Sequence, residues 1–188
     1  VGLMVRAISH RGPDHEGLWS GDNDEQICLG HRRLAIIDIS EDGNQPMISI
    51  HRHSVLAFNG EIYNYKELRV RLELEGAKFH GSSDTEVLLC ACESWGIELT
   101  LKRLVGMFAF ALWDRVERKL FLARDRAGKK PLYFGRFGDR IYFASEIKAF
   151  KAVKTLSLSI DEDALHHYLT LGFIPSSNSI YHELNIVP

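Results

Sequence analysis

The chain has 188 residues, of which 45% are hydrophobic and 26% charged, and its formal net charge is −2. This composition excludes disordered and fibrous proteins, and the length suits one large domain around a single core. Lysines and arginines are spread along the chain without forming a basic stripe, so we predict no nucleic-acid partner.

No part of the sequence indicates a membrane or secreted protein. The apolar runs fall well short of the roughly 20 residues that a membrane-spanning helix needs. The apolar N-terminus, residues 1–5, lacks the basic region of a signal peptide. We therefore predict a cytoplasmic protein with no membrane partner.

The cysteines and histidines form no recognisable disulfide or ligand pattern. The three cysteines, Cys28, Cys90 and Cys92, are odd in number, and the last two would point to different faces of a helix. The nine histidines include two close pairs, but no matched acidic cluster accompanies either pair. We therefore predict neither a disulfide framework nor a metal site.

Short segments rich in aromatic or β-branched residues, separated by turn residues, are predicted strands. In chain order they are 26–30, 34–39, 47–51, 55–58, 107–113, 120–123, 132–134 and 141–144. Helical spacing of apolar residues predicts helices over 63–75, 84–95, 99–104 and 161–171. Strands and helices thus come in groups, which favours an α+β fold over a regular strand–helix alternation.

Two helix ends carry local signals. Gly76 suits the residue that follows the helix 63–75, and Ser83 with Glu86 has the form of a capping box before the helix 84–95. The segment 172–188 is turn-rich around Pro175 and has no convincing terminal element. We therefore predict a domain over 1–171 and the start of a linker over 172–188.

Asn59 and Gly60 allow two interpretations. Asn-Gly after an apolar strand is the strongest short signal for a hairpin, so a type I′ turn is the ordinary interpretation. Together with Glu61, these residues also supply a side-chain amide, an unhindered backbone N–H and a carboxylate in consecutive positions. Those groups are the parts of an oxyanion hole and of an anchor for an ammonium group.

Arg33 and Asp84 also allow two interpretations each. Arg33 precedes an apolar segment, where it is either a solvated charge or a fork of N–H donors that binds a carboxylate. Asp84 begins the helix 84–95, where it either stabilises the helix N-terminus or provides an anion for a substrate ammonium.

Seven segments resemble, in the same order, the glutaminase domain of glutamine-dependent asparagine synthetases. They are RGPD (11–14), HRRLAIID (31–38), FNGEIYN (58–64), SDTEV (83–87), GMFAFA (106–111), RDRAGKKPLY (124–133) and FASEIKA (143–149). The resemblance implies a class II glutamine amidotransferase domain with the N-terminal-nucleophile hydrolase fold. That fold is a four-layer αββα sandwich, with two antiparallel sheets between helical layers.

The resemblance also implies a substrate site for L-glutamine. Arg33 matches the arginine that holds the glutamine α-carboxylate, and the backbone of Leu34, Ile36 and Ile37 matches the pocket lining. Asn59 and Gly60 match the oxyanion hole, and Glu61 with Asp84 matches the pair that binds the α-ammonium.

The implied reaction is hydrolysis of glutamine to glutamate and ammonia by an N-terminal cysteine. This chain begins with Val1, so we expect its numbering to start downstream of the true N-terminus. Without that cysteine the chain is expected to be inactive. In one serine hydrolase, removal of the nucleophile lowered kcat by a factor of about 10⁶.

The implied use of the ammonia is ATP-dependent amidation of aspartate in a C-terminal synthetase domain, the expected partner of this chain. The pyrophosphate-binding loop of that domain does not occur here, so no cofactor is expected in this chain. ATP and magnesium are expected only in the absent domain. Two alternatives remain open: a binding or regulatory domain that lacks a nucleophile, and the glutaminase of a paralogue that amidates another acceptor. A homodimer is a further open possibility.

Overall fold

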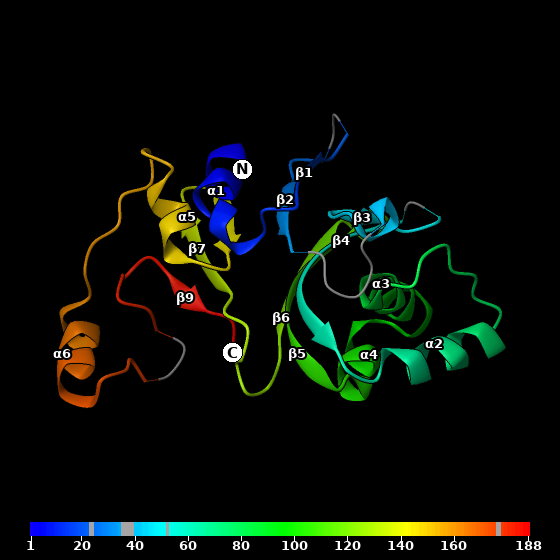
Figure 1. The fold of residues 1–188 in the computed structure, drawn as a ribbon. Helices are drawn as coiled ribbons and strands as arrows, with labels where there is room; N and C mark the ends of the chain where they lie inside the picture. The colour runs from blue at the N-terminus through cyan, green and yellow to red at the C-terminus, as the bar shows by residue number, and fades with distance from the viewer. Residues whose placement is uncertain (23–24, 35–39, 52, 176–177) are drawn as a thin grey trace.

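The computed structural model describes residues 1–22, 25–34, 40–51, 53–175 and 178–188 (Figure 1). The helices are α1 (Gly2–Ala7), α2 (Tyr65–Leu74), α3 (Asp84–Trp95), α4 (Ile97–Arg103), α5 (Ile147–Lys151) and α6 (Glu162–Leu171), with 3₁₀ turns at Ser9–Arg11 and Glu41–Gly43. The strands are β1 (His15–Ser20), β2 (Cys28–Arg33), β3 (Met47–Ile48), β4 (Ser54–Ile62), β5 (Gly106–Asp114), β6 (Lys119–Arg124), β7 (Tyr133–Phe137), β8 (Arg140–Ala144) and β9 (Asn185–Ile186).

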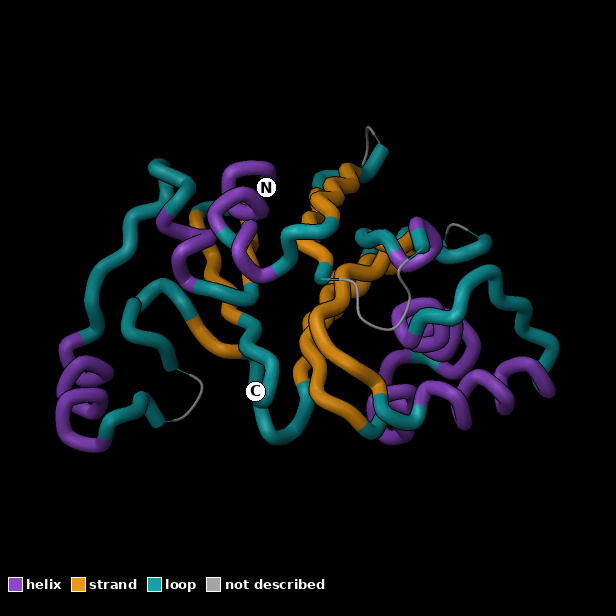
Figure 2. The backbone as a smooth tube through the Cα atoms, in the orientation of Figure 1, coloured by secondary structure: helices purple, strands orange, loops and turns teal. Residues whose placement is uncertain are grey.

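Two antiparallel sheets form the centre of the fold, and helices cover their outer faces (Figures 1 and 2). The larger sheet has the strand order β3-β4-β5-β6, and α2, α3 and α4 pack on one of its faces. The second sheet has the order β8-β7-β9, and α1 and α5 pack against it. This arrangement confirms the predicted αββα sandwich, to which the antiparallel pair β1 and β2 is an addition.

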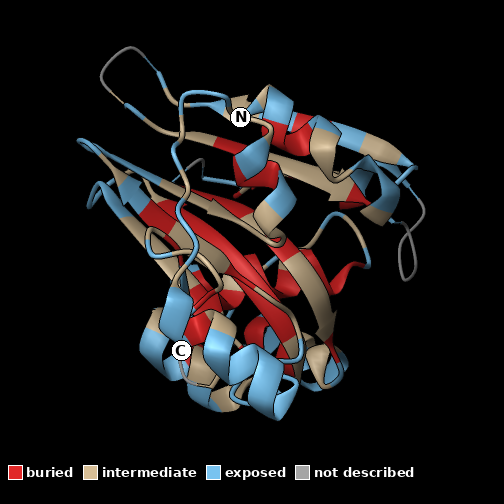
Figure 3. Ribbon diagram, turned by 90° about the vertical axis from the view of Figure 1, so that its left-hand side faces the viewer, coloured by how far each residue is buried: buried red, intermediate tan, exposed pale blue. Residues whose placement is uncertain are grey.

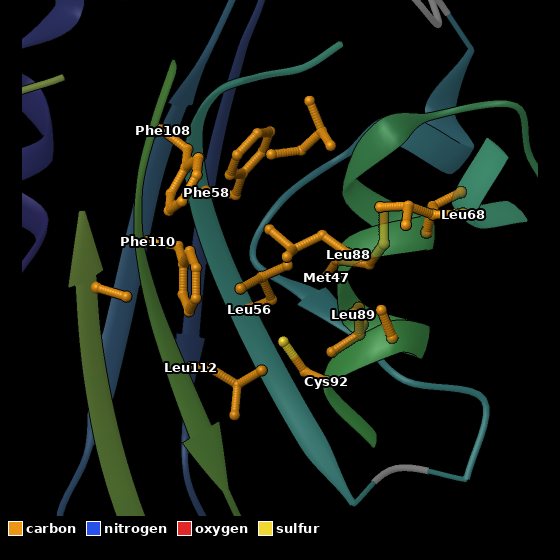
Figure 4. Close-up of a cluster of buried hydrophobic side chains, with 14 of the residues drawn as sticks. Met47, Leu56, Phe58, Leu68, Leu88, Leu89, Cys92, Phe108, Phe110 and Leu112 are labelled. Atoms are coloured by element: carbon orange, nitrogen blue, oxygen red, sulfur yellow. The ribbon is translucent and has the colours of Figure 1, made fainter. Parts of the chain in front are cut away.

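The side chains of β4 and β5 divide the core into two parts. Phe58, Phe110 and Leu112 pack against the helices that cover the larger sheet (Figure 4). Val55 and Trp113 alternate with them and pack on the opposite face, toward β2. Because both faces of these central strands are buried, the larger sheet lies inside the molecule (Figure 3).

Several expectations from the sequence need correction. Asn59 and Gly60 do not form a type I′ turn, because both lie inside β4 and pair with β5 opposite Ala109 and Phe108. Leu34 follows the end of β2 and lies in no strand, and the rest of the predicted strand 34–39 falls outside the described residues. The short elements α1, α5, β1 and β9 had no corresponding prediction.

The C-terminal residues are part of the folded structure. β9 pairs with β7 in the register Tyr133↔Ile186, and the side chains of Leu184 and Val187 are buried. Residues 184–187 therefore do not behave as a solvated linker, although the predicted domain boundary after residue 171 stays a prediction.

Helix α6 is largely exposed, with one buried residue among its ten. The sequence places Ala164, Leu165, Tyr168 and Leu169 on one face, and we expected this face to close the domain. In the structure Ala164 is the buried residue of α6, whereas Tyr168 and Leu169 are exposed. Figure 1 shows α6 at the outer end of the molecule, reached through loops on both sides.

Two further features are absent from the described residues. No described helix has both the length and the apolar character that crossing a bilayer requires. In the same part of the chain, no three His, Cys, Asp or Glu side chains gather in a way that could hold a metal ion. The predicted lack of a metal site and of a membrane partner stays a prediction.

Replacement of Leu184 with alanine tests whether the C-terminal segment belongs to the core. Leu184 is 1% exposed and packs with Met4, Ala149 and Phe150. We expect Leu184→Ala to lower the free energy of unfolding by about 2–4 kcal/mol in urea denaturation, because it leaves a cavity. Leu169→Ala is the control, since Leu169 is 75% exposed, and should change stability by less than about 0.5 kcal/mol. Equal effects of the two substitutions would contradict the assignment.

Candidate functional site

The open edge of β4 determines the geometry of the site. Phe108 on β5 makes both of its backbone hydrogen bonds with Asp125. Its N–H donates to Asp125 Oδ2 at 3.1 Å, and its C=O accepts from the N–H of Asp125 at 2.8 Å. In an antiparallel pair, opposite residues either bond each other or both point away. Gly60 lies opposite Phe108, so the N–H and C=O of Gly60 point away from β5, to the free edge of β4.

Side chains replace a neighbouring strand along this edge. β3 pairs with β4 only as far as Leu56. Two residues further, the N–H of Phe58 donates to Gln45 Oε1 at 2.6 Å, and its C=O accepts from His31 Nε2 at 2.9 Å. At Ile62 the N–H donates to Asp84 Oδ2 at 2.9 Å. Gly60 lies between these two positions.

Gly60 is glycine because of close packing against β5. A Cβ atom at this position would collide with the carbonyl oxygen of Met107 and lie 2.7 Å from the Cα of Phe108. Any larger residue would push the two strands apart and move the backbone N–H that faces the free edge.

A pocket of about 240 Å³ opens at this edge. Its lining contains all the described residues that the sequence predicted for the site, namely Arg33, Leu34, Asn59, Gly60, Glu61 and Asp84. Ile36 and Ile37 lie outside the described residues. Residues from β2, β4 and the start of α3 thus meet around one small cavity, whose size suits a small metabolite.

Arg33 supplies the buried positive charge of the pocket. It is the last residue of β2, and its Nη1 donates to Ser40 O at 2.7 Å and to Asn44 Oδ1 at 2.8 Å. A Cβ atom on Gly43 would overlap with the guanidinium group. These contacts fix the guanidinium in place, so the interpretation of Arg33 as a solvated charge is wrong.

Asp84 supplies a buried negative charge from the start of α3. Ser83, not Asp84, caps this helix, since Ser83 Oγ accepts the N–H of Glu86 at 3.2 Å. Burial raises the pKa of Asp84, the N–H of Ile62 opposes that rise, and the charge of Glu61 adds to it. A cation placed beside Asp84 would therefore relieve an unfavourable burial.

The side-chain amide of Asn59 carries donors that lack a partner among the described residues. Its side chain projects, with that of Glu61, from the face of β4 opposite Phe58 and Ile62. The Nδ2 atom is buried and has no hydrogen-bond partner within the described structure. A buried unsatisfied amide is costly, so it indicates a place where a ligand oxygen binds.

His31 is a neutral residue in the wall of the pocket. Because the carbonyl of Phe58 can only accept, His31 Nε2 carries the proton and Nδ1 does not. Burial of the ring lowers the pKa of His31 to about 4, despite the opposing effect of the bond to Phe58. The ring therefore carries no charge at neutral pH.

The sequence did not single out Gln45, His31 or Gly43 as site residues. Each lines the pocket, but its role depends on the strand or side chain that the fold places beside it. The signal that was available for His31 is its position two residues before Arg33 in a strand, which puts both side chains on one face.

None of the three cysteines lies in the pocket lining. Cys28 is in β2, and Cys90 and Cys92 are in α3. Burial raises the pKa of Cys90 and raises that of Cys92 to about 12, so neither forms a thiolate readily at neutral pH.

The protonation of His31 predicts a pH dependence of stability. Between about pH 6.5 and pH 4 the unfolded chain binds a proton at His31 that the folded chain does not. The free energy of unfolding should therefore fall as the pH is lowered through this range, by on the order of 2 kcal/mol from this residue. Urea denaturation of the wild type and His31→Gln at several pH values measures the difference. His167→Gln, at an exposed site on α6, should leave the dependence unchanged, and a His31→Gln profile parallel to the wild type would contradict the prediction.

Comparison with known proteins relates this chain to glutamine-dependent enzymes. Residues 1–188 match the family described as glutamine amidotransferase domain. Asparagine synthetase (glutamine-hydrolyzing) 1 of Bacillus subtilis is 42% identical over 177 residues, which are 94% of this chain and 27% of that protein. Asparagine synthetase (glutamine-hydrolyzing) 3 of the same organism is 39% identical over 171 residues, covering 90% of this chain and 27% of that protein.

A solved structure also matches. Glutamine phosphoribosylpyrophosphate amidotransferase from B. subtilis, complexed with ADP and GMP, aligns with a TM-score of 0.69 and 27% identity, over 81% of this chain and 40% of that chain. This chain spans about a quarter of the length of the two asparagine synthetases. The chain therefore belongs to the glutamine amidotransferase domain family and is homologous to the glutaminase domain of asparagine synthetases.

Proposed function

We propose that the pocket binds L-glutamine and presents its side-chain amide to the donors on β4. The α-carboxylate binds Arg33, and the α-ammonium binds Asp84 and Glu61. The side-chain carbonyl oxygen accepts from Asn59 Nδ2 and from the N–H of Gly60. The observation that carries this proposal is the buried Asn59 Nδ2 atom, which has no hydrogen-bond partner in the described part of the chain and adjoins the outward-facing amide of Gly60.

These two donors suit the chemistry of amide hydrolysis. A thiol that gives up its proton and attacks the side-chain carbonyl carbon of glutamine converts the carbonyl oxygen into an oxyanion. As the oxyanion collapses, the C–N bond breaks, the nitrogen takes up that proton and leaves as ammonia, and water then cleaves the remaining thioester to give glutamate and the free thiol. Donors aimed at the oxygen stabilise the transition state, and loss of one such donor costs roughly 10²–10³ in kcat in a protease. Asn59 and Gly60 take this role.

The nucleophile comes from outside these 188 residues. Cys28, Cys90 and Cys92 lie away from the pocket, so this chain alone binds glutamine without hydrolysing it through a cysteine. In the parent protein a thiol placed beside Asn59 completes the site. The parent protein is a glutamine-hydrolysing asparagine synthetase, in which ammonia amidates aspartate in a further domain that binds ATP and magnesium.

The location and the acceptor of the parent protein are also part of the proposal. A cytoplasmic location and the identity of aspartate as the acceptor are proposed by similarity to the relatives. A paralogue that amidates another acceptor would use the same glutamine site, because the acceptor binds elsewhere.

Isothermal titration calorimetry of this chain with L-glutamine tests the binding site. Arg33→Ala should weaken binding by about tenfold or more, since it removes a bidentate charge-assisted contact to the carboxylate. Because this substitution also removes the contacts to Ser40 and Asn44, Gly43→Ala provides a second variant. It keeps every charge but displaces the guanidinium, and should weaken binding by several-fold.

The matched control is Arg69→Ala. Arg69 lies on α2 and bonds to Glu73 and the carbonyl of Gly81, away from the pocket. The affinity of the Arg69→Ala variant for glutamine should equal that of the wild type. Unchanged affinity in both Arg33→Ala and Gly43→Ala would remove Arg33 from the site.

Asp84→Asn tests the ammonium contact. The asparagine oxygen can still accept the N–H of Ile62, so the fold should be retained while the negative charge is lost. We expect binding of glutamine to weaken by about tenfold, but binding of 4-carbamoylbutanoate, which lacks the ammonium, to change little. Because the pKa of Asp84 is raised, wild-type affinity for glutamine should also fall at acid pH as Asp84 becomes protonated. Equal losses for the two ligands would assign Asp84 a structural role only.

A further inference from the structure

We propose that Gln45 is a positioning residue for the oxyanion donors, acting as a substitute for a missing strand beside β4. This inference rests on the proposed glutamine site, since it assigns the residue that holds Asn59 and Gly60 in place. Gln45 does not itself contact the reacting atoms in this arrangement.

Gln45 is held in place both at its backbone and at its side-chain amide. It is 7% exposed, and a Cβ atom on Gly17 of β1 would collide with its carbonyl oxygen, so its backbone is packed tightly against that strand. Its Oε1 accepts the N–H of Phe58 at 2.6 Å, and its Nε2 donates to Thr85 Oγ1 at 3.5 Å. The side chain therefore joins β4 to the first turn of α3.

Two side chains of this kind flank Gly60. Gln45 holds the edge of β4 at Phe58, and Asp84 holds it at Ile62. Residues two apart on a strand are about 6.8 Å apart, so Gly60 lies midway between two fixed points. In the proposed site, the substrate oxygen binds at this position between the two bonds.

The fixed peptide groups adjoin the donors directly. The N–H of Phe58 is held by Gln45 and its C=O by His31, so the peptide groups on both sides of Phe58 are restrained. The next peptide group carries the N–H of Gly60, and Asn59 lies between them. Loss of the Gln45 acceptor would let this segment rotate and would misdirect both donors.

Loss of the Gln45 acceptor should therefore affect catalysis more than substrate binding. Arg33 and Asp84 hold the two ends of the glutamine backbone and do not depend on the orientation of Gly60. An oxyanion donor acts mainly in the transition state, so its misplacement lowers kcat with little change in KM.

Kinetics of glutamine hydrolysis by the full-length parent protein test the inference. Gln45→Met keeps the side-chain length but removes the acceptor, and should lower kcat about 10- to 100-fold while KM changes less than about threefold. Gln45→Glu keeps an acceptor for Phe58 and should retain most of kcat. A loss in Gln45→Met that appears in KM instead of kcat would overturn the proposal.

Thr100→Val is the matched control for a lost buried hydrogen bond. Thr100 is fully buried in α4, and its Oγ1 donates to the carbonyl of Ala91 at 2.9 Å, outside the pocket. This variant should lose thermal stability but keep kcat within about twofold, as expected for a bond remote from the site. If Gln45→Met loses stability to the same extent and keeps wild-type kcat, Gln45 has a structural role only.

NMR of this chain tests the same inference without enzymatic activity. In ¹⁵N-labelled protein, Gln45→Met should shift the amide resonance of Gly60 and the side-chain amide resonances of Asn59, and speed hydrogen exchange at Phe58. Thr100→Val should leave these signals in place. Unchanged Gly60 and Asn59 signals in Gln45→Met would overturn the proposal, whereas absence of glutamine binding to the wild type would reject the proposed function itself.

Discussion

The pairing of β4 with β5 is the constraint on which the site depends. Ser54 through Ile62 pair with β5 without interruption, whereas β3 covers β4 only opposite Val55 and Leu56. The remaining half of β4 pairs with β5 on one side, whereas no described strand pairs with its other side, which forms a free edge. Phe58 and Ile62 are buried and Asn59, Gly60 and Glu61 are partly buried, so water has limited access to this edge, and its polar groups favour partners from side chains or from a ligand.

The partners at this edge come from segments distant in sequence. Gln45, His31 and Asp84 each bond one backbone group of β4. A complete neighbouring strand would satisfy every group and leave no donor for a substrate. Among the described residues, side chains bond Phe58 and Ile62 individually, and Gly60, whose N–H points to the same edge, lies between them. Within the described residues, the site thus lies on the stretch of this edge between the side-chain bonds at Phe58 and Ile62.

How far the sequence predicts the structure depends on whether the determining contacts are local. α3 matches its predicted bounds because apolar spacing and the Ser83 cap are both local signals. The ordinary interpretation of Asn59-Gly60 as a type I′ turn is wrong, because pairing along β4 overrides the local preference for a hairpin. The motifs identified Arg33 and Asp84 as site residues, but Gln45 remained unnoticed because its partner, Phe58, is set only by the packed fold. Short elements such as β9 depend on a distant strand and carry too few residues for a periodic pattern.

Charge completes the argument for a zwitterionic ligand. The groups that stabilise the Asp84 carboxylate in this structure are backbone N–H groups, chiefly that of Ile62, and burial together with Glu61 raises its pKa. Arg33 is held from behind by Ser40 and Asn44, which are neutral acceptors. An α-amino acid brings an ammonium to the carboxylates and a carboxylate to the guanidinium, so it relieves unfavourable charge at one end and adds an ion pair at the other. In the proposed site, the guanidinium of Arg33 and the carboxylates of Asp84 and Glu61 thus bind the two charged groups of one amino acid, and the side chain of that amino acid reaches Asn59 and Gly60.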